Sequence, residues 1–254
     1  MRPDRQRLAG WRWELASLPL LLIVWQVLAI VVAHRLFPTP LEVTAEIVRV
    51  ASQGPLLADL AKTLARATSA FVIAMVLGTV LGLLLGRQAI LDRLFSAWLV
   101  VGLNLPAIVV AIVLYIWLGL TESALVAAVV INKMPLVIVT VREGVRSFSN
   151  DYEELSRALR LDFRQQLAKI YWPQLLPFML AAARTGLSLI WKIVLVFEVL
   201  GSDGGVGYRV SVLFQFFDVQ GILAYTASFI AVVLAFEYGL LRPLERRALA
   251  WRQT

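Results

Sequence analysis

The chain has 254 residues, of which 60% are hydrophobic and only 16% are charged, and its mean hydropathy is +0.79. This composition excludes an ordinary water-soluble domain, because too little polar surface is available to cover one of this length. The lack of cysteine excludes disulfides and thiol chemistry, and a single histidine, His34, argues against a histidine metal site or a Ser-His-Asp triad. The net charge of +7 comes with no soluble basic domain, so nucleic-acid binding is not expected.

Six apolar segments are long enough to cross the hydrocarbon core of a membrane, which takes about 20 mainly apolar residues. In chain order they are 15–33, 67–86, 95–118, 123–141, 178–200 and 221–241. The first follows several arginines, as a signal peptide does, but its apolar run is too long and no convincing cleavage site follows, so we interpret it as an uncleaved span. The sequence therefore predicts an all-α polytopic membrane protein with about six transmembrane helices.

Lys and Arg are distributed unevenly about these spans. With the N-terminus inside, sixteen of them fall in cytoplasmic segments and five outside. Because positive residues near span ends concentrate in the cytoplasm, both termini are expected there. The predicted organisation is a cytoplasmic segment 1–14, a transmembrane domain 15–241 containing a cytoplasmic loop 142–177, and a cytoplasmic tail 242–254.

The segment 35–66 is predicted to lie outside the membrane. Two prolines open it, and apolar residues then recur at a helical spacing, namely Leu41, Val43, Ile47 and Val48. This pattern indicates an amphipathic helix on the outer face.

Two glycine patterns favour structure over ligand binding. Gly78, Gly82 and Gly86 recur every four residues within one span, which is typical of close helix packing. The stretch Gly201–Gly207 lacks the preceding strand of a dinucleotide-binding turn, so we expect a flexible outer loop or a gate.

The loop 142–177 is predicted to form two short helices. Asn150 with Glu153, and Asp162 with Gln165, have the form of two capping boxes. Apolar residues then share one face of each helix: Leu155 and Leu159 on the first, and Phe163, Leu167, Ile170 and Tyr171 on the second. Pro173 is expected to end the second helix and Pro177 to open the next span. Apolar faces require a partner surface, so a hairpin of no special role is the less favoured alternative.

Glu154-Leu-Ser and Ile170-Tyr-Trp-Pro173 resemble the E-A-A-x3-G-x9-I-x-L-P loop of binding-protein-dependent ABC importer permeases, with matching spacing. The resemblance covers roughly residues 36–254. Further matching segments favour the nitrate/sulfonate/taurine branch, namely Phe37–Val43, Gly78–Arg87, Arg184, Trp191, Glu198, Gly201, Gly205–Tyr208 and Arg242–Arg247.

This resemblance implies the type I ABC importer permease fold and makes the loop a coupling helix that docks on a cytoplasmic ATPase subunit. The coupling residues that it implies are Glu153, Glu154, Leu155, Ser156, Ala158, Leu159, Arg160, Leu161, Asp162, Ile170 and Pro173. The sequence departs from the motif at two places: Arg160 replaces its glycine, and Leu155-Ser156 replaces its Ala-Ala. Arg160 is therefore expected either to take a strained left-handed backbone or to sit in a differently shaped turn fixed by Asp162.

The resemblance also implies the partners. They are a second copy of the permease, two ATPase subunits that hold the ATP and Mg, a periplasmic or lipid-anchored substrate-binding protein, and the lipid bilayer of a bacterial inner membrane. No cofactor and no catalytic residue are expected in this chain, and no lysine follows a glycine as a phosphate-binding loop would require.

Polar residues within spans are costly unless they face protein or water, which makes them candidates for the translocation path. These candidates are Asn104, Asn132, Lys133, Ser188, Lys192 and Glu198. Lys133 and Lys192 would give the path a positive field that favours anions such as sulfonates, nitrate or carboxylates. The alternative for Lys133 is a hydrogen bond to a helix carbonyl freed by Pro135.

Two rival functions stay open at this point. An ATPase-independent secondary transporter or channel would show inverted repeats or a buried acidic relay, and neither is clear. A membrane-embedded enzyme is disfavoured because no histidine, cysteine or paired-carboxylate constellation is present.

Overall fold

The computed structural model describes residues 4–148 and 160–243, and these residues form helices and short turns without a strand. The helices are α1 (Asp4–Val32), α2 (Pro40–Gln53), α3 (Leu56–Arg87), α4 (Ala89–Asn104), α5 (Ala107–Leu118), α6 (Glu122–Arg146), α8 (Phe163–Gln166), the π-helix η1 (Leu167–Tyr171), α9 (Trp172–Gly201), α10 (Val206–Gln215), α11 (Val219–Phe236) and the π-helix η2 (Glu237–Leu241). The predicted all-α fold is confirmed.

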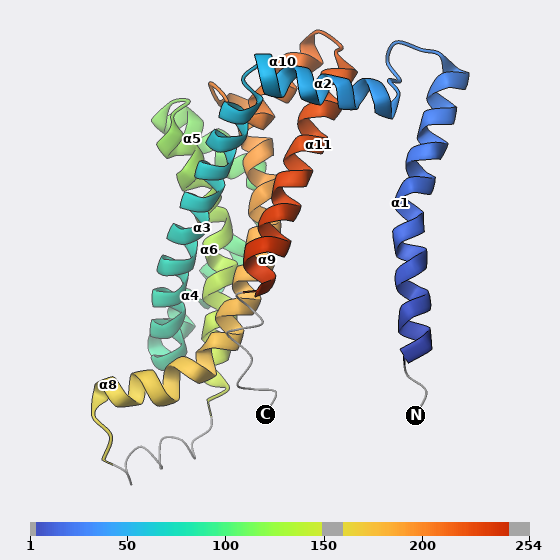
Figure 1. Cartoon of the computed structure of the whole chain (residues 1–254). Coiled ribbons are helices and arrows are strands. Elements are labelled where there is room, and N and C mark those ends of the chain that lie inside the picture. The colour runs from blue at the N-terminus through green and yellow to red at the C-terminus, as the bar shows by residue number, and fades with distance from the viewer. Residues whose placement is uncertain (1–3, 149–159, 244–254) are drawn as a thin grey trace.

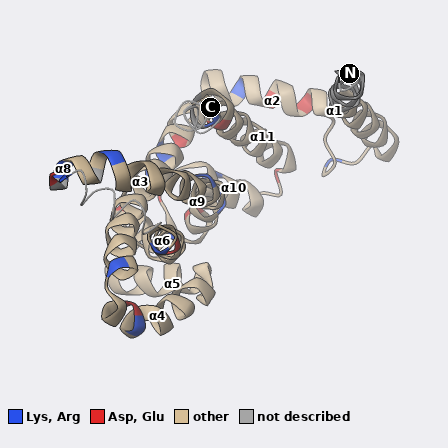
Figure 2. Ribbon diagram, turned by 90° about the horizontal axis from the view of Figure 1, so that it is seen from below, with Lys and Arg blue, Asp and Glu red and all other residues tan. Residues whose placement is uncertain are grey.

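Four long helices, α3, α6, α9 and α11, run side by side as a bundle (Figure 1). Among the described residues, these four are long and apolar enough to cross a membrane, and the bent pair α4–α5 adds a fifth if it is one span. The short helices α2 and α10 lie at one end, here called the α10 end, and α8 crosses the other, here called the loop end (Figure 1). Helices α1 and α4 lie on opposite sides of the bundle (Figure 2).

The predicted span 95–118 is not a straight helix. It is broken at Leu105 and Pro106, and α4 and α5 meet there at 97°. Proline supplies no backbone N–H and disfavours the helical conformation of the residue before it, which accounts for the break. Helix α1 covers the predicted first span 15–33 except for its last residue.

The predicted outer segment 35–66 holds the amphipathic helix α2 and also the start of α3. Thr39 and Glu42 form a capping box at the start of α2, whose inner side buries Val43 and Val50. The remaining residues, from Leu56 on, already belong to α3, which starts eleven residues before the predicted span.

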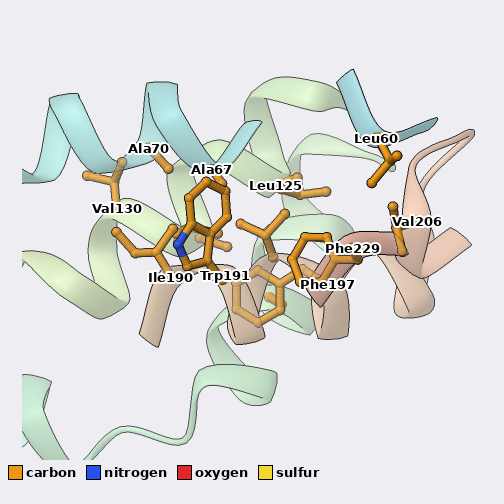
Figure 3. Packing of buried hydrophobic residues seen from close by; sticks show 14 of the residues in the cluster. Leu60, Ala67, Ala70, Leu125, Val130, Ile190, Trp191, Phe197, Val206 and Phe229 are labelled. Carbon is orange, nitrogen blue, oxygen red and sulfur yellow. The ribbon is translucent and has the colours of Figure 1, made fainter. Parts of the chain in front are cut away.

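Helices α3 and α6 touch along the three glycines that the sequence suggested for packing. A Cβ atom added to Gly78 would lie 2.6 Å from Val137, and one added to Gly82 would lie 2.7 Å from Val141. Because real Cβ atoms do not come this close, the backbones can approach only where glycine is present. Between α3, α6, α9 and α11 lies the main core, in which Trp191 meets the edge of Phe229 at 6.3 Å between ring centroids (Figure 3).

The seam between α3 and α6 leads to a first prediction. Gly82→Ala should lower the free energy of unfolding by about 1–3 kcal/mol, because the added methyl group overlaps Val141 and the Ile138 carbonyl. Thermal unfolding of the detergent-purified protein measures this change. Gly239→Ala is the matched control, because a Cβ there has no atom within 4 Å. Equal melting temperatures for the two variants would contradict the account of the seam.

Candidate functional site

The second predicted helix of the loop begins as expected. Residues 160–162 are not helical, and α8 begins at Phe163. The backbone of Asp162 donates a hydrogen bond to the Gln165 side chain at 3.4 Å, which is one half of the predicted capping box. Arg160 has a φ of 47°, so the position of the motif glycine keeps a left-handed backbone even though arginine occupies it.

The other coupling candidates fall into two groups. Ile170 is buried, Leu161 and Pro173 are half-buried, and Arg160 and Asp162 are exposed. The remaining six, with the first predicted helix of the loop, lie outside the described residues: Glu153, Glu154, Leu155, Ser156, Ala158 and Leu159.

Pro173 does not end the loop helix, as the sequence had suggested. Helices α8, η1 and α9 follow one another without a break from Phe163 to Gly201. The wider turn of the π-helix η1 lies just before Pro173, where the proline leaves a carbonyl of the preceding turn without its usual donor. The Gln174 side chain donates to the Ile170 carbonyl at 3.1 Å and adds a hydrogen bond in the same turn. The chain thus turns from α8 into α9 while remaining helical.

A cavity of about 560 Å³ lies between α9 and α11. Its walls are mainly apolar and include three aromatic side chains, Phe71, Trp191 and Phe229. Six polar or charged residues also line it, namely Arg184, Ser188, Lys192, Thr226, Glu237 and Arg242. Glu237 and Arg242 pair with each other at 3.8 Å, so the cavity is an apolar chamber with a few polar and charged groups, as is typical of sites for small molecules.

The structure brings two of the six path candidates, Ser188 and Lys192, to this cavity. The others lie elsewhere. Asn104 is exposed at the end of α4 and donates to its own helix at Val100, at 2.8 Å, and Asn132 is half-buried in α6.

Lys133 is buried within α6, with an exposed fraction of 8%. Among the described residues it has no hydrogen bond or ion pair, so the alternative that we considered, a bond to a helix carbonyl freed by Pro135, is not formed there. Burying an ammonium group without a partner costs free energy, so we expect a ligand or a water molecule to bind the Lys133 side chain.

Glu198 is at the centre of an ion-pair cluster at the α10 end and does not line the cavity. Its side chain is fully buried, and one oxygen accepts from Arg66 at 2.7 Å. The same guanidinium pairs with Glu122 at the start of α6 and donates to the Gly204 carbonyl at 2.6 Å. Because Glu198 is held by Arg66, it neutralises neither Lys133 nor Lys192.

Further charges surround this pair. Lys62 lies 2.6 Å from Asp203, and this hydrogen bond lowers the pKa of the Asp203 carboxyl. Asp59 accepts from Arg209 at 3.1 Å and from the Tyr225 hydroxyl at 3.2 Å. The cluster therefore joins α3 to α6, α9, α10 and α11.

The glycine-rich stretch 201–207, which we expected to be a flexible outer loop or a gate, is a hydrogen-bonded turn between α9 and α10. Three backbone N–H groups at the start of α10 donate to side chains of α3 and α9: Gly205 to Asp59 at 3.1 Å, Val206 to Thr63 at 2.9 Å and Gly207 to Glu198 at 2.8 Å. Gly205 has a φ of 97°, which a side chain would strain. These bonds satisfy N–H groups that have no partner within the helix.

Sequence reasoning missed the ion-pair cluster because it placed 56–66 outside the membrane spans and did not join these residues to the helix that follows. Asp59, Lys62, Thr63 and Arg66 are three or four residues apart, so they share one face of the extended α3. This spacing is the feature of the sequence from which the cluster could have been predicted. Their partners on α9 and α10 are more than 130 residues away in the sequence, which no local pattern reveals.

A protein-family model described as "Binding-protein-dependent transport system inner membrane component" matches residues 63–247. Three relatives align with nearly the whole chain. A Bacillus subtilis protein assigned as an aliphatic sulfonates transport permease, SsuC, is 27% identical and covers 100% of this chain and 92% of its own. The riboflavin transport system permease protein RibX of Chloroflexus aurantiacus is 31% identical, with 98% and 95% covered. The taurine transport system permease protein TauC of Escherichia coli is 24% identical, with 95% and 93% covered.

Among solved structures, the fold is similar to a chain of the MetNI methionine ABC transporter in an inward-facing conformation. The TM-score is 0.66 at 18% identity, over 77% of this chain and 97% of the other. At this identity the likeness concerns the fold alone.

The left-handed backbone of Arg160 leads to a second prediction. Arg160→Gly should slow amide hydrogen exchange in α8, because glycine removes a strain of about 1–2 kcal/mol that other residues bear in this conformation. Arg164→Gly, the same change inside α8, should speed exchange, because glycine costs about 1 kcal/mol in a helix. Changes of the same sign in both variants would contradict this account of the turn.

Proposed function

The chain belongs to the family of binding-protein-dependent transport system inner membrane components, and we propose that it forms the path by which an ATP-driven importer takes up a small organic anion. It is a multi-pass inner-membrane transport permease, and its family is one of permeases rather than enzymes. ATP hydrolysis is then the task of a separate subunit, which also holds the ATP and Mg.

The observation that carries this proposal is the geometry of the loop. A left-handed residue at Arg160 is followed by a capped helix that crosses the loop end of the bundle (Figure 1). A short helix presented in this way is suited to dock in a cleft of a cytoplasmic subunit. Residues 153–173 are the proposed docking segment.

The assembly that we propose contains two copies of this chain, two ATPase subunits and an external binding protein. The binding protein delivers the solute to the α10 end. Closure of the ATPases moves the two loops, and the bundles then expose the path alternately to the two sides of the membrane.

The proposed solute is an anion because of the cavity and the lysines. Lys192 lines the cavity, and Lys133 is buried without a partner among the described residues, whereas the buried carboxylate Glu198 is already paired with Arg66. An organic sulfonate, such as those named for SsuC and TauC, combines an anionic head with an apolar part and fits this lining. The name of RibX gives a different solute, riboflavin, so family membership alone does not select the solute.

An ATPase-independent transporter or channel is the second candidate. It would need its own energy-coupling groups in the membrane, such as a relay of carboxylates. The buried carboxylates Glu198 and Asp59 are bonded to arginines at the α10 end, which favours the ATP-driven alternative.

We place the loop end in the cytoplasm. The excess of Lys and Arg in the segments at that end supports this orientation, and the starts of α1 and η2 lie at the same end as α8 (Figure 1). Both termini would then be cytoplasmic, with 1–14 and 242–254 as the flanking segments.

Orientation and docking can be tested together with single cysteines. Ala168→Cys, exposed in η1, should react in sealed cells only with reagents that cross the membrane, and bound ATPase subunit should protect it. Ser52→Cys, exposed at the end of α2, should react with impermeant reagents whether or not the ATPase is present. Labelling of position 168 from outside would disprove the orientation, and equal labelling with and without the ATPase would disprove docking.

The anion path gives a further prediction. Lys192→Met should reduce ATP-dependent uptake of a radiolabelled alkanesulfonate about tenfold, equivalent to about 1.4 kcal/mol, because a cation that attracts the solute is lost. Lys192→Arg keeps the charge and should retain most of the uptake. Lys133→Met should also reduce uptake in complexes that assemble and hydrolyse ATP. Wild-type uptake in both methionine variants, or a cationic natural solute, would contradict the proposal.

A further inference from the structure

Tyr171, the last residue of the π-helix η1, contacts two other helices at the loop end. The guanidinium carbon of Arg87, the last residue of α3, lies 4.6 Å from the centroid of the Tyr171 ring. The ring of Phe148, two residues beyond α6, lies 5.7 Å from the same ring, with the planes inclined at 35°. A single side chain of the loop segment thus meets the ends of both α3 and α6.

The two helix ends that Tyr171 meets are firmly joined to each other. A Cβ added to Gly86 would lie 2.7 Å from the side chain of Val145, so the backbones of α3 and α6 are in close contact there. The buried Asp92 of α4 accepts from Arg142 at 3.1 Å and also pairs with Arg146. The ends of α3 and α6 and the start of α4 therefore form one block.

The segment that carries Tyr171 is built differently. It is a π-helix between α8 and α9, and π-helical turns are frequent at functional sites. Pro173, two residues later, supplies no backbone N–H to the helix there. A displacement of α8 can therefore pass along the backbone into α9 only through an irregular turn, whereas Tyr171 offers a direct side-chain contact with the block.

We propose that Tyr171 is a positioning residue that transmits the displacement of the loop helix to the joined ends of α3 and α6. This proposal rests on the proposed coupling function of the loop. The ring face attracts the Arg87 guanidinium, so it can draw the end of α3 along, and its packing on Phe148 resists compression. Through the glycine seam, the motion then reaches the whole length of α3 and α6.

The experiment follows a cysteine in the cavity, because this readout needs no knowledge of the solute. The permease carrying Ser188→Cys is reconstituted with its ATPase subunits, and the rate of reaction with a maleimide is measured with and without ATP and vanadate. In this background, trapping the ATPases in the closed state should change the labelling rate by at least about fivefold. This factor is the lower end of the range in which one site commonly affects another.

Adding Tyr171→Leu should abolish most of this nucleotide effect while ATP hydrolysis continues, because the ring contact is lost. Tyr171→Phe removes only the hydroxyl and keeps the ring, so it should keep the nucleotide effect. If the hydroxyl were required for structural reasons, this variant would lose the effect as well. Tyr238→Leu is the matched control. Arg242 lies 4.0 Å from the Tyr238 ring centroid, and both residues lie at η2, so this cation–ring contact stays within one element.

A nucleotide effect of normal size in Tyr171→Leu would overturn the inference. Should that variant fail to assemble, Arg87→Gln removes the partner on α3 without altering the loop, and a normal effect there would overturn the inference in the same way. No nucleotide effect in the unaltered Ser188→Cys background would instead contradict the coupling function on which the inference rests.

Discussion

The close contact between α3 and α6 determines where most of the other elements lie. Without side chains at Gly78, Gly82 and Gly86, the two backbones approach until they meet the valines of α6. Both charge clusters are then built on this pair. At the α10 end, Arg66 of α3 joins Glu122 of α6, and at the loop end Asp92 joins the last turn of α6. In lipid, where the hydrophobic effect does not hold helices together, close packing and polar bonds of this kind are the available attractions.

Charged residues within the membrane-crossing helices serve two different purposes. Arg66 and Glu198 are bonded to each other and to the start of α10, so their burial is offset by hydrogen bonds, and loss of either partner would leave an uncompensated charge. Lys192 faces a cavity, and Lys133 is buried with no hydrogen-bond or ion-pair partner in the part of the chain that the structure describes. The paired groups thus belong to the framework, and the unpaired cations are the groups available for a solute.

The sequence was sufficient to predict an all-α fold, the amphipathic α2, the glycine contacts and the non-helical residues before α8, because each depends on residues close together in the chain. Hydropathy alone could not place the start of α3, since Asp59, Lys62 and Arg66 lower the local average although the fold buries Asp59 and Arg66. The break at Pro106 and the continuous helix through Pro173 show that a proline does not by itself decide whether a helix ends. In α9 the carbonyls before the proline are satisfied by a π-turn and by Gln174, whereas Leu105 takes an extended backbone.

The two ends of the bundle differ in how tightly they are held. At the α10 end, Asp59, Thr63 and Glu198 bind the N–H groups of α10 directly, so that α3, α9 and α10 are joined by buried hydrogen bonds. At the loop end, α8 is followed by a π-helix and meets the block of α3 and α6 through the ring of Tyr171. Opening a π-turn or sliding an aromatic contact costs less than separating buried charges. A force applied at the loop would therefore first rearrange the loop end and the cavity beside it, while the α10 end resists until its ion pairs exchange partners.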